Sequence, residues 1–415
     1  MLLAPTQAAA HAFRERYDLP LPLPLWLVAA GLVVALSFAV FAFSPQRAVP
    51  SPRILVLRIH PVVIALLRTI SVGVLCVIIA AGLLGAQDPF RNLAPAFVWI
   101  AWWIGFTYLC AVFGDLWALA NPWKVVNPKG RFTLPRAVGA WPAAALFLAF
   151  AWIEIVWHDN AVPANIAWLA VGYSALTAAG MYAFGRDAWL ASGEVFSVYF
   201  GFIARLAPLE WRADNELYLR APAAGLLDPA PLSPSQAFFV IAMLATVTFD
   251  GLRDTPLWPP GDLSWTVGLL TLPVLFALVL FGVCSLMKDR SPGELLRLFV
   301  PTLLPIAIAY HVAHYLSYLL IAGQVVIPLV SDPLGRGWNL VGTAHHQVAV
   351  DIVGARFAWY TSVVVIVAGH VLAMYLAQRA AHRRLAVRSQ YPLAALMVGY
   401  TMLSLWILAQ PVVEP

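Results

Sequence analysis

Charged side chains are scarce in this sequence: Asp, Glu, Lys and Arg together make up only 11% of its 415 residues. Hydrophobic residues make up 62%, and the mean hydropathy is +0.81. A soluble domain of this length cannot bury so many apolar side chains, because its surface must still be covered. The composition therefore excludes an ordinary soluble protein and predicts that lipid surrounds most of the chain.

Cysteine and the familiar catalytic motifs are also scarce. The three cysteines, Cys76, Cys110 and Cys284, fall inside apolar runs and form no C-x-x-C pair, so we expect small buried apolar residues rather than disulfides or a thiolate metal site. The sequence contains no G-x-x-x-x-G-K-[ST], G-x-S-x-G or H-E-x-x-H motif. ATP hydrolysis, serine-esterase chemistry and zincin proteolysis therefore lack their usual residues.

Long apolar runs recur along the whole chain. A helix needs about 20 apolar residues to cross a bilayer, which predicts an all-α polytopic transmembrane helical bundle of about ten spans. The expected spans are residues 25–43, 69–86, 94–119, 140–157, 164–184, 237–252, 265–287, 298–322, 355–377 and 392–409.

The distribution of positive charge predicts the orientation. With both the N-terminus and the C-terminus outside, 19 of the 25 basic residues fall in cytoplasmic segments, as the positive-inside rule requires. The expected location is the bacterial inner (cytoplasmic) membrane, with membrane lipid as the main partner. The basic residues are spread over five short loops instead of forming a stripe, so nucleic-acid binding is not expected.

The regions outside the spans divide simply. Residues 1–24 are expected to be an outer tail or a truncated signal remnant, 25–409 a single transmembrane domain, and 410–415 an outer C-terminal tail. Residues near 189–207 are too apolar for a free loop and predict a helix that lies in the interface or dips partway into the bundle. The stretch that follows, up to Gln236, is expected to be a loop with one hairpin. His11 follows three alanines, where it is either a copper-chelating new N-terminus or a solvated tail residue.

Ionisable groups inside the spans are the main functional candidates, because each costs about 2.5–3.5 kcal/mol to insert. His311 and His314 are three residues apart, so both imidazoles lie on one face of the eighth span and suit a single metal. We expect Asp250 and His345 to complete a site for a divalent transition metal, zinc or copper. The expected catalytic residues are Asp250, His345, His346 and Asp351.

Other ionisable groups allow different interpretations. Glu154 and His158 lie near the same outer end, whereas Asp115, Glu194, His60 and His370 lie toward the inner side. The inner group predicts either a second cluster for protons or ordinary hydrogen bonding between helices. The outer histidines also allow an interpretation without metal or catalysis. Each could form a hydrogen bond between helices, and His345 and His346 could be solvated in their loop.

Several segments together resemble a known family of bacterial membrane proteins, the fenitrothion hydrolases. The strings that carry the resemblance are His11-Ala-Phe-Arg-Glu-Arg-Tyr-Asp, Asp88-Pro-Phe-Arg-Asn-Leu-Ala-Pro, Asn121-Pro-Trp, Thr248-Phe-Asp-Gly-Leu, Ala309-Tyr-His-Val-Ala-His-Tyr-Leu-Ser and Ser331-Asp-Pro-Leu-Gly-Arg-Gly-Trp. The resemblance implies hydrolysis of an apolar organophosphorus triester by an enzyme in the inner membrane. It also allows for a second membrane subunit as a partner. It supplies no catalytic residues, so the site above is inferred from spacing and depth, with metal-bound hydroxide attacking phosphorus.

Two other functions stay open at this point. The outer histidines also fit a membrane component of copper handling or electron transfer, with a bound metal or a haem between facing histidines. A solute transporter is the third possibility and is less favoured, because the ionisable groups crowd the outer half of the bundle instead of marking a continuous path across it.

Overall fold

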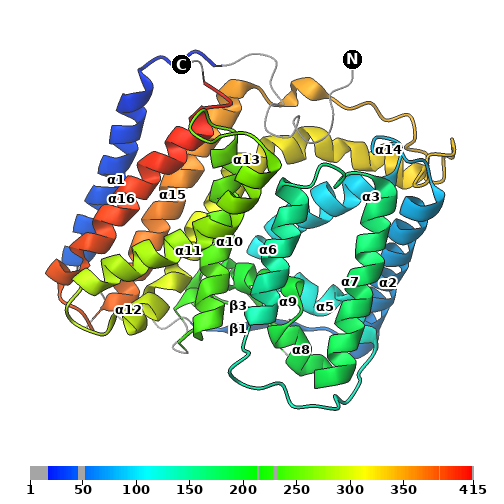
Figure 1. Ribbon diagram of the computed structural model, residues 1–415, viewed down its shortest axis with the longest axis horizontal. Helices are drawn as coiled ribbons and strands as arrows, with labels where there is room; N and C mark the ends of the chain where they lie inside the picture. Colours follow the sequence, from blue (N-terminus) through cyan, green and yellow to red (C-terminus); the bar gives the residue numbers. More distant parts are fainter. Residues whose placement is uncertain (1–16, 45–51, 213–214, 228–230, 383, 414–415) are drawn as a thin grey trace.

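The computed structural model describes residues 17–44, 52–212, 215–227, 231–382 and 384–413, and these fold into a bundle of membrane-length helices (Figure 1). The expected all-α polytopic bundle is confirmed: nine helical segments of the described chain are long and apolar enough to cross a membrane. The helices that cross the bundle are α1 (Leu23–Phe43), α2 (Pro61–Leu84), α4 (Phe106–Phe113) with the preceding π-helix, α6 (Trp141–Ile155), α7 (Pro163–Phe184), α10 (Pro234–Arg253), α11 (Asp262–Leu286), α13 (Leu304–Ala322), α15 (Ala355–Ala381) and α16 (Tyr391–Ala409).

The two ends of the described chain lie side by side. The backbone N–H of Tyr17 donates to the carbonyl of Val412 over 2.8 Å, and Figure 1 shows both ends on one side of the bundle. A chain that returns to its starting face crosses an even number of times. The tenth crossing is α6, which has only 15 residues and falls below membrane length by itself. We call the side with both ends the terminal face.

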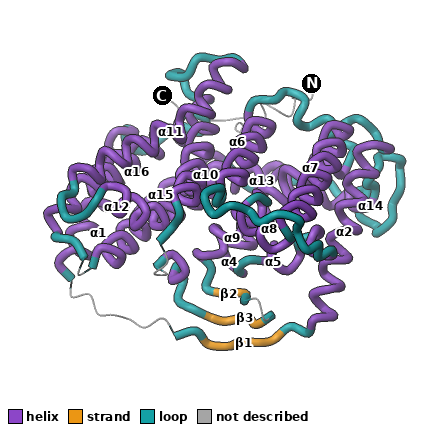
Figure 2. The backbone as a smooth tube through the Cα atoms, turned by 60° about the horizontal axis from the view of Figure 1, so that its bottom comes forward, coloured by secondary structure: helices purple, strands orange, loops and turns teal. Residues whose placement is uncertain are grey.

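The opposite side carries a small β-sheet, and we call it the sheet face (Figure 2). Strand β1 (Ile54–Arg58) pairs antiparallel with β3 (Glu216–Leu219), which also pairs with β2 (Leu209–Trp211), so the order is β1-β3-β2. The β2–β3 hairpin lies in the stretch where one hairpin was expected. Strand β1 was not expected, because its apolar residues lead directly into the apolar run of α2.

Helix α10 is the centre of the bundle. Most of its residues are buried, and it packs against α6, α11, α13 and α16. Helices α1, α2 and α11 lie at the perimeter, where apolar side chains such as Leu36, Leu66 and Leu278 are about 60% exposed. Apolar side chains exposed on long helices are stable only in lipid. The interior around α10 is therefore where polar groups meet protein instead of lipid.

Short helices fill the bundle near the sheet face. They are α5 (Leu116–Ala120), α8 (Arg186–Ser192), α9 (Val195–Ile203) and α12 (Pro292–Phe299). The expected helix near 189–207 is thus two helices, which break at Gly193 and Glu194 because the Glu194 carboxylate caps α9 by accepting from the N–H groups of Phe196 and Ser197. Most of α9 is buried, so this segment enters the bundle instead of lying on its surface.

A long connection, residues 323–354, covers part of the terminal face. It contains α14 (Val326–Ser331) and packs over the turn between α2 and α3 (Leu93–Pro95), where Ala86 N–H donates to the Leu334 carbonyl over 2.8 Å. Gly335 has a φ of +68°, a left-handed conformation that favours glycine, and its carbonyl accepts from Arg91. The described hydrogen bonds therefore hold this turn of the connection to α2 and to the segment that leads into α3.

The three cysteines all lie in the described chain and are free thiols. Cys110 and Cys284 are buried as expected, whereas Cys76 is exposed. The expectation of burial is wrong for Cys76 because α2 is a perimeter helix, and an apolar run in sequence does not distinguish the lipid-facing side of a span from its protein-facing side.

Candidate functional site

Asp250 lies near the terminal end of the central helix α10 and is almost fully buried. Its carboxylate accepts three contacts: Arg253 Nη2 lies 3.2 Å from Oδ1, His314 Nε2 lies 3.1 Å from Oδ2, and the Tyr315 hydroxyl donates to Oδ2. A buried carboxylate is stable only when charge and hydrogen bonds compensate its lost hydration. The three partners supply that compensation from two helices, α10 and α13.

Arg253 extends this cluster toward the terminal face. Its guanidinium donates to the Ile155 carbonyl, lies over the Trp265 ring at 5.3 Å, and lies 3.8 Å from Asp254. The exposed fraction of the side chains rises from 7% at Asp250 to 14% at Arg253 and 29% at Asp254. A graded polar path therefore links the buried carboxylate with the terminal face.

Glu154 is a second carboxylate, located in the last turn of α6. Its Oε1 accepts a hydrogen bond of 2.6 Å from the Trp103 indole N–H. Trp103 belongs to a ten-residue π-helix, Ala96–Gly105, that continues into α4. Segments of π-helix are rare in proteins as a whole, but those that occur are often found at functional sites. The wider turn redirects side chains that an α-helix would place elsewhere. Here it accompanies a tryptophan whose N–H reaches a carboxylate inside the bundle.

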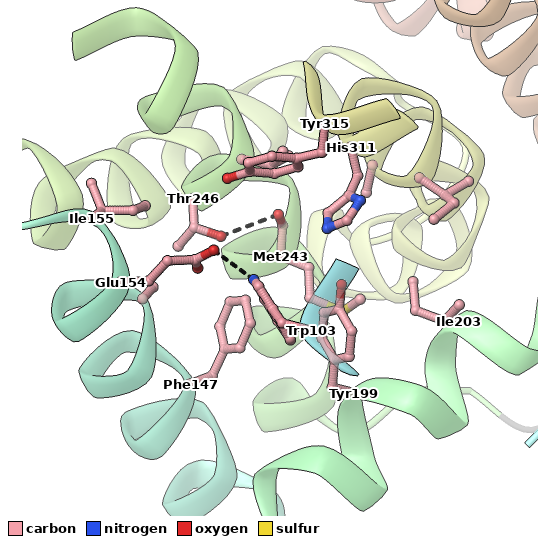
Figure 3. A pocket seen from close by; sticks show the side chains of 14 residues that line it. Trp103, Phe147, Glu154, Ile155, Tyr199, Ile203, Met243, Thr246, His311 and Tyr315 are labelled. Carbon is pink, nitrogen blue, oxygen red and sulfur yellow. Dashed lines mark hydrogen bonds between the residues drawn. The ribbon is translucent and has the colours of Figure 1, made fainter. Parts of the chain in front are cut away.

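Glu154, His311 and Tyr315 line one internal cavity (Figure 3). Its volume is about 30 Å³, and Trp103 and Thr246 also contribute to its wall. A cavity of this size and polarity has room for one or two water molecules. Because Tyr315 lines the cavity and also donates to Asp250, its hydroxyl joins the cavity to the Asp250 cluster.

His311 is held in an aromatic cage without a hydrogen bond to its ring. The ring centroid lies 4.8 Å from that of Tyr315 and 5.4 Å from that of Tyr108, whose hydroxyl donates to the His311 carbonyl. Neither ring nitrogen has a protein partner within the described residues. A buried imidazole without partners is costly unless water occupies the adjacent space, so the cavity is the natural place for its missing partner.

The structure brings together only part of the expected site. Asp250 and His314 are in contact, and His311 and Glu154 line the neighbouring cavity. The loop residues His345, His346 and Asp351 are exposed, and no described contact joins them to the Asp250 cluster. His158 pairs with Asp262 at 2.8 Å instead of joining Glu154 four residues earlier. His11 lies outside the described residues.

The donor set does not fit the expected zinc or copper site. Within the described residues, no three His, Cys, Asp or Glu side chains group to hold a metal ion. Asp250 also has the Arg253 guanidinium against one oxygen and a tyrosine hydroxyl against the other, so a second cation would meet a positive charge already in place. The expected ligands His311, His314, Asp250 and His345 are therefore not brought to one centre.

The residues that the sequence interpretation missed are Arg253, Tyr315 and Trp103. Arg253 follows Asp250 by three residues, a spacing that places an ion pair on one face of a helix, and Tyr315 is adjacent to His314. Both signals were present in the sequence. The Trp103–Glu154 contact joins residues 51 positions apart through an unexpected π-helix, and nothing in the sequence indicates it.

The inner candidates lie in separate surroundings. Glu194 accepts from Tyr173, Trp117 and several other donors in a fully satisfied network that fixes α9. His60 and Asp115 cap α2 and α5. His370 Nδ1 lies 2.9 Å from the Ile366 carbonyl within α15, and its ring lies 5.6 Å from that of Tyr400. These contacts favour structural roles for Glu194, His60 and Asp115.

No family model, curated protein or solved structure matches this chain.

Proposed function

We propose that this chain transfers protons within the membrane, through cavity water between Glu154, His311 and Tyr315 and onward to the Asp250–His314 pair, and that this transfer drives transport of a solute. The observation that carries the proposal is the position of Tyr315. Its side chain lines the water-sized cavity while its hydroxyl donates to Asp250. Ionisable groups that face the interior of a membrane bundle are rare and commonly mark proton relays.

Each step of the relay moves one proton between neighbouring groups. Tyr315 passes its hydroxyl proton to Asp250 as it accepts another from cavity water, so no tyrosinate is left behind. Asp250 then passes the proton to His314 Nε2, 3.1 Å away, which accepts it when the imidazole carries its own proton on Nδ1. On the cavity side, Glu154 and His311 exchange protons with the same water. Arg253 keeps its charge throughout and holds Asp250 in place.

The size of the cavity favours proton transfer over binding of a large substrate. A volume of about 30 Å³ admits water, whereas sites for drug-sized molecules are about ten times larger or more. The solute would accordingly bind elsewhere in the bundle or in a conformation with a wider interior. Transport requires such a second conformation in any case.

A hydrolase of organophosphorus triesters is the second candidate, and one observation favours it. The water-sized space beside Glu154 and His311 is the arrangement in which a base holds a hydrolytic water. An imidazole nitrogen of His311 would take a proton from a water molecule. The oxygen of that water would attack phosphorus, and the aryloxide would leave. This version needs no metal, but it requires the bundle to open for a substrate that enters from lipid.

Proteoliposomes distinguish the two candidates. We expect a potassium diffusion potential to drive proton uptake, detected by an internal pH dye, in the wild type and much less in Glu154→Gln, which keeps the acceptor for Trp103 but cannot exchange a proton. Equal uptake by both would contradict the proposal. Turnover of a nitrophenyl phosphotriester that is lost in His311→Gln, without proton uptake, would establish the hydrolase instead. A visible absorption band in the purified protein would point to the haem alternative.

A further inference from the structure

The internal cavity offers a bound molecule more hydrogen-bond acceptors than donors, because most donors in its wall are already used. The Trp103 indole N–H donates to Glu154 Oε1 over 2.6 Å. The Thr246 hydroxyl donates to a carbonyl of its own helix over 3.3 Å, and the Tyr315 hydroxyl donates to Asp250. A hydroxyl whose hydrogen is committed acts toward a further molecule only as an acceptor.

Glu154 is the strongest of these acceptors. Its Oε2 atom has no hydrogen-bond partner, and its carboxylate forms no ion pair, within the described residues. His311 is 6% exposed and presents two ring nitrogens without partners in the described chain, one of which accepts when the imidazole is neutral. Figure 3 shows both side chains pointing into the cavity, from α6 and α13. An ionised carboxylate buried here therefore lacks a cation of its own.

Aromatic rings form much of the remaining wall. Trp103, Phe147, Tyr199 and Tyr315 all line the cavity. The face of an aromatic ring attracts a cation, and the attraction is strongest at tryptophan and where water is excluded. One carboxylate surrounded by such rings is the chemistry that recognises ammonium groups.

The size of the cavity selects among cations. Its volume of about 30 Å³ has room for one or two water molecules, and an ammonium ion is about as large as water. Ammonium donates hydrogen bonds in every direction and accepts none, which matches a wall of acceptors. Potassium is of similar size, but it binds within rings of oxygen ligands, and much of this wall consists of an imidazole and aromatic rings.

We propose that the cavity binds an ammonium ion, which takes the place of the relay water, contacts Glu154 and His311, and regulates the relay by holding Glu154 ionised. This rests on the proposed function, because the ion occupies the cavity of the relay itself. The ion is a regulator and is distinct from the transported solute.

Ammonium and the proton compete for Glu154. Because the cation selects the ionised carboxylate, its affinity should rise with pH until Glu154 is fully ionised. Protonation of His311 would oppose the cation in the same direction. Asp250 and Arg253 are paired at 3.2 Å, so their opposite charges leave the sign of the competition unchanged. The titratable and charged groups that face Glu154 are Asp250, Arg253, Tyr199, His311, Tyr315 and Tyr318.

Binding is tested by thermal unfolding in detergent at neutral pH, in equal concentrations of ammonium, potassium or tetramethylammonium chloride. A ligand of the folded state raises the unfolding temperature. We expect ammonium to raise it above the other salts in the wild type and in Glu294→Gln, whose carboxylate lies on α12. In Glu154→Gln the affinity should fall about tenfold or more. An undiminished effect in Glu154→Gln, or an equal effect of potassium on the wild type, would overturn the proposal.

A second pair of variants locates the ion without removing Glu154. Phe147→Leu should enlarge the cavity, because Phe147 lines it and is 3% exposed. We expect stabilisation by methylammonium, relative to ammonium, to increase in this variant. Phe202→Leu is the control, since it shortens a buried ring that is not part of the cavity wall, and its ratio should equal that of the wild type. An increase in both variants, or in neither, would contradict the location.

Infrared difference spectroscopy separates ammonium binding from the relay. The carbonyl band of protonated Glu154 should weaken when ammonium replaces potassium at constant pH. A Glu154 band that responds to pH but not to ammonium would overturn ammonium binding and leave the relay intact. Absence of the band at every pH, with ammonium stabilisation still lost in Glu154→Gln, would contradict the relay and support the ammonium site.

Discussion

The Nε2 atom of His314 lies 3.1 Å from Oδ2 of Asp250 and joins α13 to α10 inside the bundle. This contact places an imidazole beside a carboxylate that is almost fully buried. Arg253 Nη2 lies 3.2 Å from the other carboxylate oxygen, so Asp250 is held between an imidazole and a guanidinium. Removing one member of such a buried group leaves the others unpaired.

Asp250→Asn should destabilise the bundle. Loss of the carboxylate leaves the Arg253 guanidinium without its buried counter-charge and with only the more exposed Asp254, 3.8 Å away, and breaking a buried pair in this way costs about 3–5 kcal/mol. Thermal unfolding in detergent measures the effect. Asp262→Asn is the control, because it removes an Asp–His contact of 2.8 Å between side chains that are about 60% exposed, and such pairs contribute about 0–1 kcal/mol. Similar losses in both variants would contradict the burial argument.

Tyr315→Phe should interrupt the relay while keeping the aromatic packing. The change removes the hydroxyl that joins the cavity to Asp250, and proton uptake in proteoliposomes should fall to the level of Glu154→Gln. Tyr400→Phe is the matched control, since it removes a buried hydroxyl that hydrogen-bonds to Thr248 away from the cavity. If Tyr400→Phe abolished proton uptake and Tyr315→Phe did not, the proposed route would be wrong.

His311→Leu should separate stability from function. Neither ring nitrogen has a partner among the described residues, so replacing the imidazole with an apolar side chain should change the free energy of unfolding by about 1 kcal/mol or less, in either direction. Function should nevertheless be lost, because leucine exchanges no proton. A large loss of stability, measured by thermal unfolding, would instead assign His311 a structural role.

Gly369→Ala should destabilise the packing of α15 on α13. A methyl group at this position would lie 2.8 Å from the Pro305 carbonyl oxygen, so the helices must separate, at a cost of about 1–3 kcal/mol. At Gly399 in α16 the same substitution meets no atom within 4 Å. Gly399→Ala should accordingly be neutral or stabilising by up to about 1 kcal/mol, and a destabilised Gly399→Ala would refute the steric explanation.

Glu210 should make the stability of the sheet dependent on pH. Burial alone would raise the pKa of Glu210, but the hydrogen bond from Arg53 and the charges of Arg220, Arg53 and Arg212 outweigh it and lower the pKa below its usual value. The ion pairs therefore contribute stability above the pKa of the unfolded chain, about 4.3, and this contribution is lost as the pH falls through the lower folded pKa.

The measurement is the difference in unfolding temperature between the wild type and Glu210→Gln. The difference should be constant from about pH 7 to pH 5 and shrink below about pH 4. A difference that grew on acidification would have the wrong sign for a lowered pKa.

The spans were predictable from the sequence because lipid imposes one requirement on each, a long apolar helix. α6 shows the limit, since only the meeting of Tyr17 with Val412 identifies its 15 residues as a crossing. Strand β1 was hidden because apolar alternation cannot be detected in a run that is apolar throughout.

The candidate site was predictable only in part. Intramembrane charge singled out Asp250 and the α13 histidines, as the cost of inserting charge requires. The expected loop ligands His345 and His346 do not join them, because the position of a loop beside a span in the sequence does not indicate which helices of that face the loop covers. The 323–354 connection packs on α2 and α3, away from the Asp250 cluster.

The central claim is that Glu154 exchanges protons inside the bundle, and infrared difference spectroscopy tests it most directly. Spectra of the purified protein in lipid should contain the carbonyl stretch of a protonated carboxylic acid that appears and disappears with pH and shifts in heavy water. This band should be absent from Glu154→Gln and present in Glu294→Gln, whose carboxylate lies on α12 outside the cluster. A spectrum of Glu154→Gln identical to that of the wild type would contradict the proton relay.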